Sequence, residues 1–122
     1  MNDSALASVS MGYQIGVTPL QMAAAASVIA NGGTLYEPHV VRATMKGGVR
    51  TAVPPKAVRQ AILPETAAML TTIMEGVVTD GTAKRAALAS YTVAGKTGTA
   101  DKLVNGRYSP SQQNVSFVGF VP

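Results

Sequence analysis

Four consecutive residues, Lys96, Thr97, Gly98 and Thr99, place an ammonium group, two hydroxyls and an unobstructed stretch of backbone side by side. Lysine supplies a compact positive charge, and threonine hydroxyls hydrogen-bond to a carboxylate. Because glycine has no Cβ, another polypeptide can lie close against this backbone. The stretch is therefore suited to an anionic, peptide-like ligand.

A phosphate-binding loop is the first alternative, because it also contains Gly-Lys-Thr. Its pattern, G-x-x-x-x-G-K-[ST], opens a helix, and with Gly95 as the second glycine the first falls on Ser90. The residues after Thr97 are a poor helix start, whereas residues 91–93 before the motif favour a strand. Nucleotide binding is disfavoured on both spacing and context.

A Lys-Thr-Gly motif on a strand is instead the third signature of serine penicillin-recognising enzymes, beside S-x-x-K and S-x-N. Other segments of the chain match in order and spacing, including Gly-Tyr-x-x-x-Val-Thr-Pro-Leu-Gln. The chain resembles the class B penicillin-binding proteins, and its loop at residues 106–109 is most similar to their septal, cell-division subtype. The matching segments are residues 11–21, 30–33, 38–41, 81–86, 96–99 and 116–122.

The S-x-x-K and S-x-N signatures do not occur: no serine of this chain is followed by a lysine at the third position or by an asparagine at the second. In the family both precede the Gly-Tyr segment. We therefore interpret residues 1–122 as the C-terminal portion of one transpeptidase (penicillin-binding) domain, lacking both motifs. The parent is expected to be a serine-type D,D-transpeptidase, and this chain alone to be inactive because the nucleophile is absent.

The resemblance implies a partial penicillin-binding-protein/β-lactamase-like transpeptidase fold of α/β (α+β) type, with helices packed on an antiparallel sheet. It implies a parent that cross-links peptidoglycan stem peptides ending in D-Ala-D-Ala through an acyl-enzyme serine, without a cofactor or metal. β-Lactams, which mimic that terminus, would be ligands of the same site. A second hypothesis stays open: a truncated, non-catalytic binding or interaction module. An S-x-x-K followed by S-x-N before residue 1 would favour the enzyme.

The resemblance also assigns roles to the motif. Lys96 would supply positive potential for the substrate's terminal carboxylate and support proton transfer. Thr97 and Thr99 would hydrogen-bond that carboxylate, and the backbone N–H of Thr99 would form one arm of the oxyanion hole. Gly98 would let the substrate lie antiparallel to this strand like an added strand.

Composition limits the other classes of function. The chain is 47% hydrophobic but only 13% charged, against about a quarter in soluble domains, which suggests surfaces covered by neighbours. The net charge is +4, yet the basic residues are scattered, Trp is absent and only six residues are Phe or Tyr, so nucleic-acid binding is disfavoured. With no cysteine, one histidine and no acidic cluster, a metal site is not expected.

The longest apolar stretch, residues 22–30, is too short to cross a bilayer. In the family a membrane anchor at the N-terminus holds the catalytic domain outside the cytoplasmic membrane. The resemblance therefore places the parent at the extracytoplasmic face of the bacterial cytoplasmic membrane, through an anchor that this chain lacks.

Two helices are predicted to position the motif. Thr18 and Gln21 form a capping box around Pro19, and residues 22–30 are so rich in alanine that the helix should be buried on most sides. Residues 31–33 end it. A second helix should run from Pro64 to Asp80, with a core stripe at residues 70, 73, 74 and 77. Thr82 should cap a short helix over residues 83–88.

Strands are predicted around these helices. Residues 35–45 favour one or two short strands, and residues 46–48 should turn into a further strand at 49–53, with His39 a surface or structural residue. Residues 91–100 form the strand that carries the motif. After a turn at residues 105–106, residues 114–121 should return antiparallel, with their apolar side chains buried on both faces.

Overall fold

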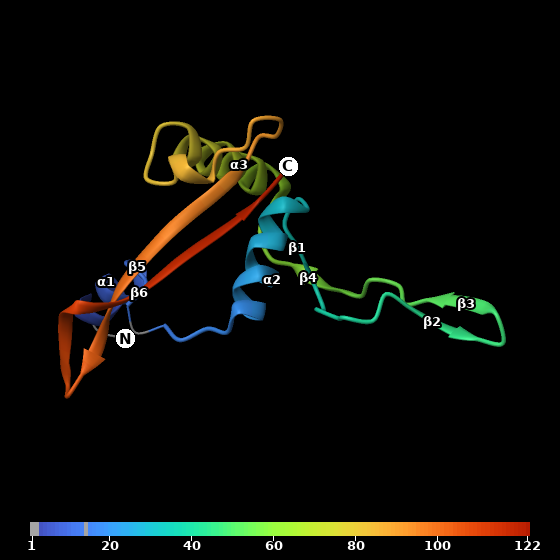
Figure 1. Cartoon of the computed structure of the whole chain (residues 1–122), viewed down its shortest axis with the longest axis horizontal. Helices are drawn as coiled ribbons and strands as arrows, with labels where there is room; N and C mark the ends of the chain where they lie inside the picture. Colours follow the sequence, from blue (N-terminus) through green and yellow to red (C-terminus); the bar gives the residue numbers. More distant parts are fainter. Residues whose placement is uncertain (1–2, 14) are drawn as a thin grey trace.

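The computed structural model describes residues 3–13 and 15–122. Met1 and Asn2, and Gln14 within the Gly-Tyr segment, lie outside the described residues. In Figure 1 the helices α2 and α3 and the long β5–β6 hairpin make up the body, and the β2–β3 hairpin projects from it. In chain order the elements are α1 (Asp3–Ser10), α2 (Pro19–Ala30), β1 (Thr34–Tyr36), β2 (Ala43–Lys46), β3 (Val49–Ala52), β4 (Ala57–Gln60), α3 (Pro64–Thr79), the 3₁₀ helix η1 (Lys84–Ala86), β5 (Ala94–Val104) and β6 (Arg107–Phe120).

The start of α2 confirms the predicted capping box. The Gln21 backbone N–H donates to Thr18 Oγ1 at 3.2 Å, and the Thr18 backbone N–H donates to Gln21 Oε1 at 2.8 Å. The predicted burial of this helix is wrong for the described structure, because only its residues Ala26 and Val28 are buried. Leu20 is 60% exposed, since the described elements pack against one side of the helix only.

A glycine pair ends α2 and turns the chain into β1. Gly32 and Gly33 have φ angles of +80° and +101°, a region that side chains rarely permit. The Gly33 N–H donates to the Val28 carbonyl at 2.7 Å, and its own carbonyl accepts from the N–H of Ala61 at 2.8 Å and of Ile62 at 3.3 Å. Gly33 thereby joins the helix end to the segment between β4 and α3.

The strands form three separate antiparallel pairs, β1–β4, β2–β3 and β5–β6. The predicted class, helices with antiparallel strands, is confirmed, although the strands do not build one common sheet in the described part of the chain. The sequence did not predict α1 or β4. The motif strand β5 begins at Ala94, so the strand predicted for residues 91–93 is wrong. Both strands of the β5–β6 hairpin extend further towards their turn than predicted, with a register shift between Asp101 and Lys102. His39 is exposed, as expected.

The core is small and lies where α3 meets the start of β5. Val78, Ala83 and Val93 form its buried cluster, with Val77 packed against them. Met74 is buried as predicted, but Ile73 is 57% exposed, because it points away from the helix face that α3 turns to the body. The burial predicted for β6 is also wrong. Its residues Phe117 and Val118, with Phe120 and the adjacent Val121, are partly or largely exposed.

Candidate functional site

The motif lies in the first half of β5, where the strand is fully paired with β6. Lys96 pairs with Val118, Thr97 with Phe117, Gly98 with Ser116 and Thr99 with Val115. The strand assignment confirms the sequence prediction for this segment and separates it from a phosphate-binding loop, which opens a helix. In the two-stranded sheet the edge of β5 away from β6 carries no further strand of the described chain.

Glycines shape the backbone around the motif. A Cβ on Gly95 would lie 2.5 Å from Phe117 Cζ, and one on Gly119 would lie 2.9 Å from the same atom, so the phenyl ring crosses both glycines. A Cβ on Gly98 would lie 2.7 Å from Ser116 Oγ. The ring and the serine therefore use the space that side chains on β5 would otherwise fill, which keeps this part of the strand bare.

Lys96 is exposed, and its ammonium Nζ donates a hydrogen bond to the Thr97 carbonyl oxygen at 2.7 Å. The positive charge is thus held against its own strand. Half-buried Thr97 has its hydroxyl oxygen 2.8 Å from that of Thr82, and either hydroxyl can donate. Thr82 was predicted to cap a helix, which is wrong: Ala83 is the N-cap of η1, and no side chain caps it.

A groove lies between the β5–β6 hairpin and α2. It has a volume of about 860 Å³, and Gly98, Thr99 and Ala100 of β5 line one side of it. The other walls come from β6, from α2 and from the segment that precedes α2, including Gly12. Lys96 and Thr97 do not line this groove, so the structure places Gly98 and Thr99 at it and keeps Lys96 and Thr97 beside it.

An aromatic contact ties the Gly-Tyr segment to the far part of the hairpin. The rings of Tyr13 and Tyr108 meet edge to face, with centroids 5.3 Å apart and an interplanar angle of 70°. Tyr13 follows α1, whereas Tyr108 belongs to β6. The contact holds the segment before α2 against the hairpin at one end of the groove. Tyr13 lies within a segment that the sequence analysis singled out, but no motif in the sequence indicated its contact with Tyr108.

The sequence matches the model of the penicillin binding protein transpeptidase domain over residues 1–122. It is 39% identical over 119 residues to stage V sporulation protein D of Bacillus subtilis, covering 95% of this chain and 18% of the relative. It is 37% identical over 121 residues to the probable peptidoglycan D,D-transpeptidase PbpC of Pseudomonas aeruginosa, covering 97% of this chain and 20% of the relative. The chain thus spans about a fifth of the length of these relatives.

Comparison with solved structures points to the same family of domains. PBPA from Mycobacterium tuberculosis superposes with a TM-score of 0.83 at 28% identity, over 98% of this chain and 27% of that one. The imipenem acyl-enzyme complex of penicillin-binding protein A from M. tuberculosis gives a TM-score of 0.80 at 27% identity, over the same shares. The D,D-transpeptidase domain of a peptidoglycan glycosyltransferase from Eggerthella lenta gives 0.72 at 34% identity, over 84% and 23%. The described fold is therefore a portion of a fold found in these domains.

Proposed function

Because this chain belongs to the penicillin-binding protein transpeptidase domain family, we propose that it is part of a peptidoglycan D,D-transpeptidase. In this enzyme, the residues of this chain bind the C-terminal carboxylate of the stem peptide. The observation that carries the proposal is the placement of Lys-Thr-Gly-Thr on β5, with Gly98 and Thr99 lining the groove beside α2. β-Lactams are expected to occupy the same place.

Each motif residue has a role in this proposal. The Lys96 ammonium supplies positive potential at the strand, and the hydroxyls of Thr97 and Thr99 hydrogen-bond the carboxylate, an interaction that the ligand's charge strengthens. The Thr99 N–H stabilises the oxyanion that develops when the penultimate carbonyl is attacked. Donors of that kind contribute roughly 3–4 kcal/mol to the transition state in enzymes that use them.

The attacking serine and its activating lysine come, in this proposal, from a part of the parent protein outside these residues. Exposed apolar side chains around the groove support a contact with that other part of the parent: Met22 is 42% exposed and Phe117 is 48% exposed. Apolar surface of this extent favours contact with another part of a protein. We propose that the remainder of the transpeptidase domain covers it and brings the nucleophile towards β5.

Peptidoglycan lies outside the cytoplasm, so the proposal places the parent at the extracytoplasmic face of the bacterial membrane. Among the described helices, none has the length and apolar character that crossing a bilayer requires.

Acylation of the full-length protein by a fluorescent penicillin tests the proposal. Lys96→Ala is expected to lower the acylation rate by roughly two to three orders of magnitude, because the site loses its charge while the strand keeps its pairing. Lys102→Ala is the matched control, since Lys102 is an exposed lysine of the same strand that lies outside the Lys-Thr-Gly-Thr motif. An unchanged rate in Lys96→Ala would contradict the assigned role. Wild-type protein that is never acylated would favour the non-catalytic module.

A further inference from the structure

The positive charge of this chain is concentrated in one region. Half of its ten basic residues lie between positions 42 and 59, and no acidic residue occurs between positions 38 and 64. The other five basic residues share the rest of the chain with all six acidic ones. The basic residues look scattered along the sequence, yet the segment that contains the β2–β3 hairpin carries a charge of +5, whereas the rest of the chain has a net charge of −1.

This hairpin, which we call the basic arm and define as residues 42–53, projects from the body (Figure 1). All strand residues of β2 and β3 except half-buried Ala43 are exposed. The pairing continues to its base, where the Val53 N–H donates to the Arg42 carbonyl at 3.0 Å. Beyond the base, Lys56 forms a 2.6 Å ion pair with Glu37. The hydrogen bond and charge of Lys56 lower the pKa of Glu37, so this carboxylate stays ionised and paired with Lys56.

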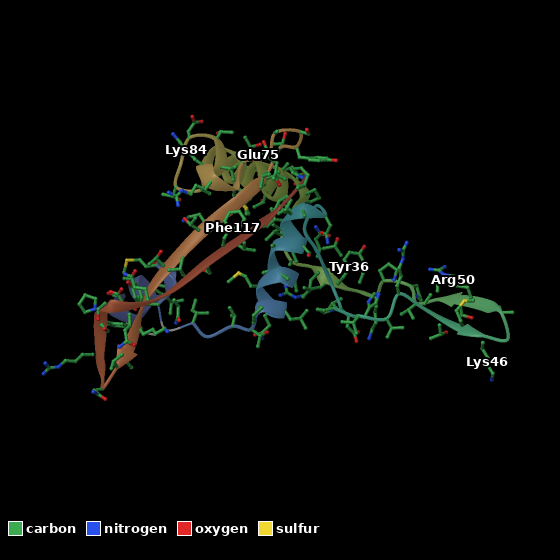
Figure 2. The ribbon with its side chains drawn as sticks, viewed as in Figure 1. Tyr36, Lys46, Arg50, Glu75, Lys84 and Phe117 are labelled. Carbon is green, nitrogen blue, oxygen red and sulfur yellow. The ribbon has the colours of Figure 1, made fainter. Side chains whose placement is uncertain are left out.

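The cations of the arm lie on both of its faces. Lys46 pairs with Val49 and Arg50 pairs with Met45, and because successive pairs of a hairpin face opposite ways, the two cations point apart. Figure 2 shows Lys46 and Arg50 leaving the ribbon on opposite sides. Arg42 has the same parity as Lys46 and so continues its face towards the base. No ion pair joins these three cations to an acid of the described residues.

We propose that the basic arm is a second contact for the anionic wall polymer, binding carboxylates of a peptidoglycan strand other than the one held at β5. The identity of the polymer rests on the proposed function. Charge complementarity favours it, since an extended polyanion can pass along an arm that carries cations on both faces. The arm leaves the body on the side away from the β5–β6 turn (Figure 1), so the two strands need not compete.

A membrane surface fits the arm less well. Peripheral insertion requires a contiguous apolar face, whereas the exposed Met45 and Val49 of the arm, each 67% exposed, lie on opposite faces. If a partner protein covered one face of the arm and left the other in solvent, the two faces would be expected to differ in polarity. Both faces of the arm instead combine aliphatic side chains with at least one cation: Met45 lies with Arg50 on one face, and Val49 and Val53 lie with Arg42 and Lys46 on the other.

Co-sedimentation of the full-length protein with purified, insoluble peptidoglycan tests the arm. The protein is first acylated with penicillin, so that β5 contributes no substrate contact. Lys46→Glu with Arg50→Glu is expected to raise the dissociation constant about tenfold at low salt, because two attractive charges become repulsive. The difference should shrink at high salt as the charges are screened.

Lys84→Glu with Arg85→Glu is the matched control, because both residues are exposed on η1 and the net charge changes equally. This control is expected to change the dissociation constant less than about twofold. Equal losses in the two variants, or no loss in the arm variant, would overturn the proposal. So would arm-dependent binding to phosphatidylglycerol vesicles without arm-dependent binding to peptidoglycan. Failure of the acylation step reports separately on the proposed function, and unchanged acylation in the arm variant shows that its fold is intact.

Discussion

The hydroxyl of Thr82 lies 2.8 Å from that of Thr97, and this single contact joins the turn after α3 to the motif strand. A hydroxyl can donate only one hydrogen bond while it accepts others. If Thr82 donates, the Thr97 hydroxyl keeps its hydrogen for a carboxylate; if Thr82 accepts, that hydrogen is used. Thr82 therefore acts as a positioning residue for Thr97 in the proposed carboxylate site.

Replacing Thr82 should weaken the site without removing a group that meets the ligand. Thr82→Val keeps the shape of the side chain and loses the hydroxyl, so acylation by penicillin is expected to slow about fivefold, since such a hydrogen bond contributes about 1 kcal/mol. Thr82→Ser keeps the hydroxyl and should stay within about twofold of the wild type. The measurement is the acylation rate as a function of penicillin concentration. Equal behaviour of the two variants would show that the hydroxyl has no positioning role.

Among the elements, the junction of α2 with the β1–β4 pair depends on Gly33. Its φ of +101° belongs to a region that side chains rarely adopt. A Cβ there would overlap the Ile62 carbonyl oxygen and would come within 2.6 Å of Gln60 Nε2. Gln60 itself donates to the Gly32 carbonyl at 3.0 Å, so the surrounding backbone is fixed by several hydrogen bonds and has little room to move.

Gly33→Ala is therefore expected to lower the free energy of unfolding by about 3 kcal/mol or more, because it combines backbone strain with a steric overlap. Gly47→Ala provides the comparison. Gly47 also has a positive φ, +55°, but nothing lies within 4 Å of its added Cβ, so the expected cost is about 1 kcal/mol. Urea unfolding of the two variants of the full-length protein measures both values. A smaller loss for Gly33→Ala than for Gly47→Ala would contradict the overlap argument.

Across the whole molecule, large apolar side chains remain exposed on the elements that surround the groove. Leu20 is 60% exposed on α2, and Val115 is 76% exposed on β6. The buried residues of the described chain are mostly alanine and valine, with Met74 the one larger side chain among them. Such a core is thin for a chain of 122 residues, which agrees with the proposal that further parts of the domain pack against these surfaces.

This chain by itself is expected to form no covalent adduct with penicillin, because no serine in it is followed by a lysine at the spacing that activates the nucleophile in this family. Intact-mass spectrometry after incubation with penicillin checks this directly. A mass increase of one penicillin per chain, on any residue, would show that a nucleophile is present among these residues. The full-length protein should acquire the adduct under the same conditions.

Features that depend on neighbouring residues were predictable from the sequence. The capping box of Thr18 and Gln21, the turn at Gly47 and Gly48, and the turn at Asn105 all follow from the chemistry of a few adjacent positions. The strand carrying Lys96 was predictable for the same reason, as was the family, because its motifs are short and their order is preserved.

What only the tertiary structure decided are relations between residues that are distant along the chain. The partner of Thr82 lies fifteen positions further on, so no local pattern distinguished a helix cap from a contact with the motif strand. Burial of α2 and β6 depends on which elements cover them, and periodicity shows that a face is apolar without showing what meets it. That the basic arm projects from the body was likewise decided only by the tertiary structure, because a turn at residues 46–48 predicts a hairpin without fixing its direction relative to the helices.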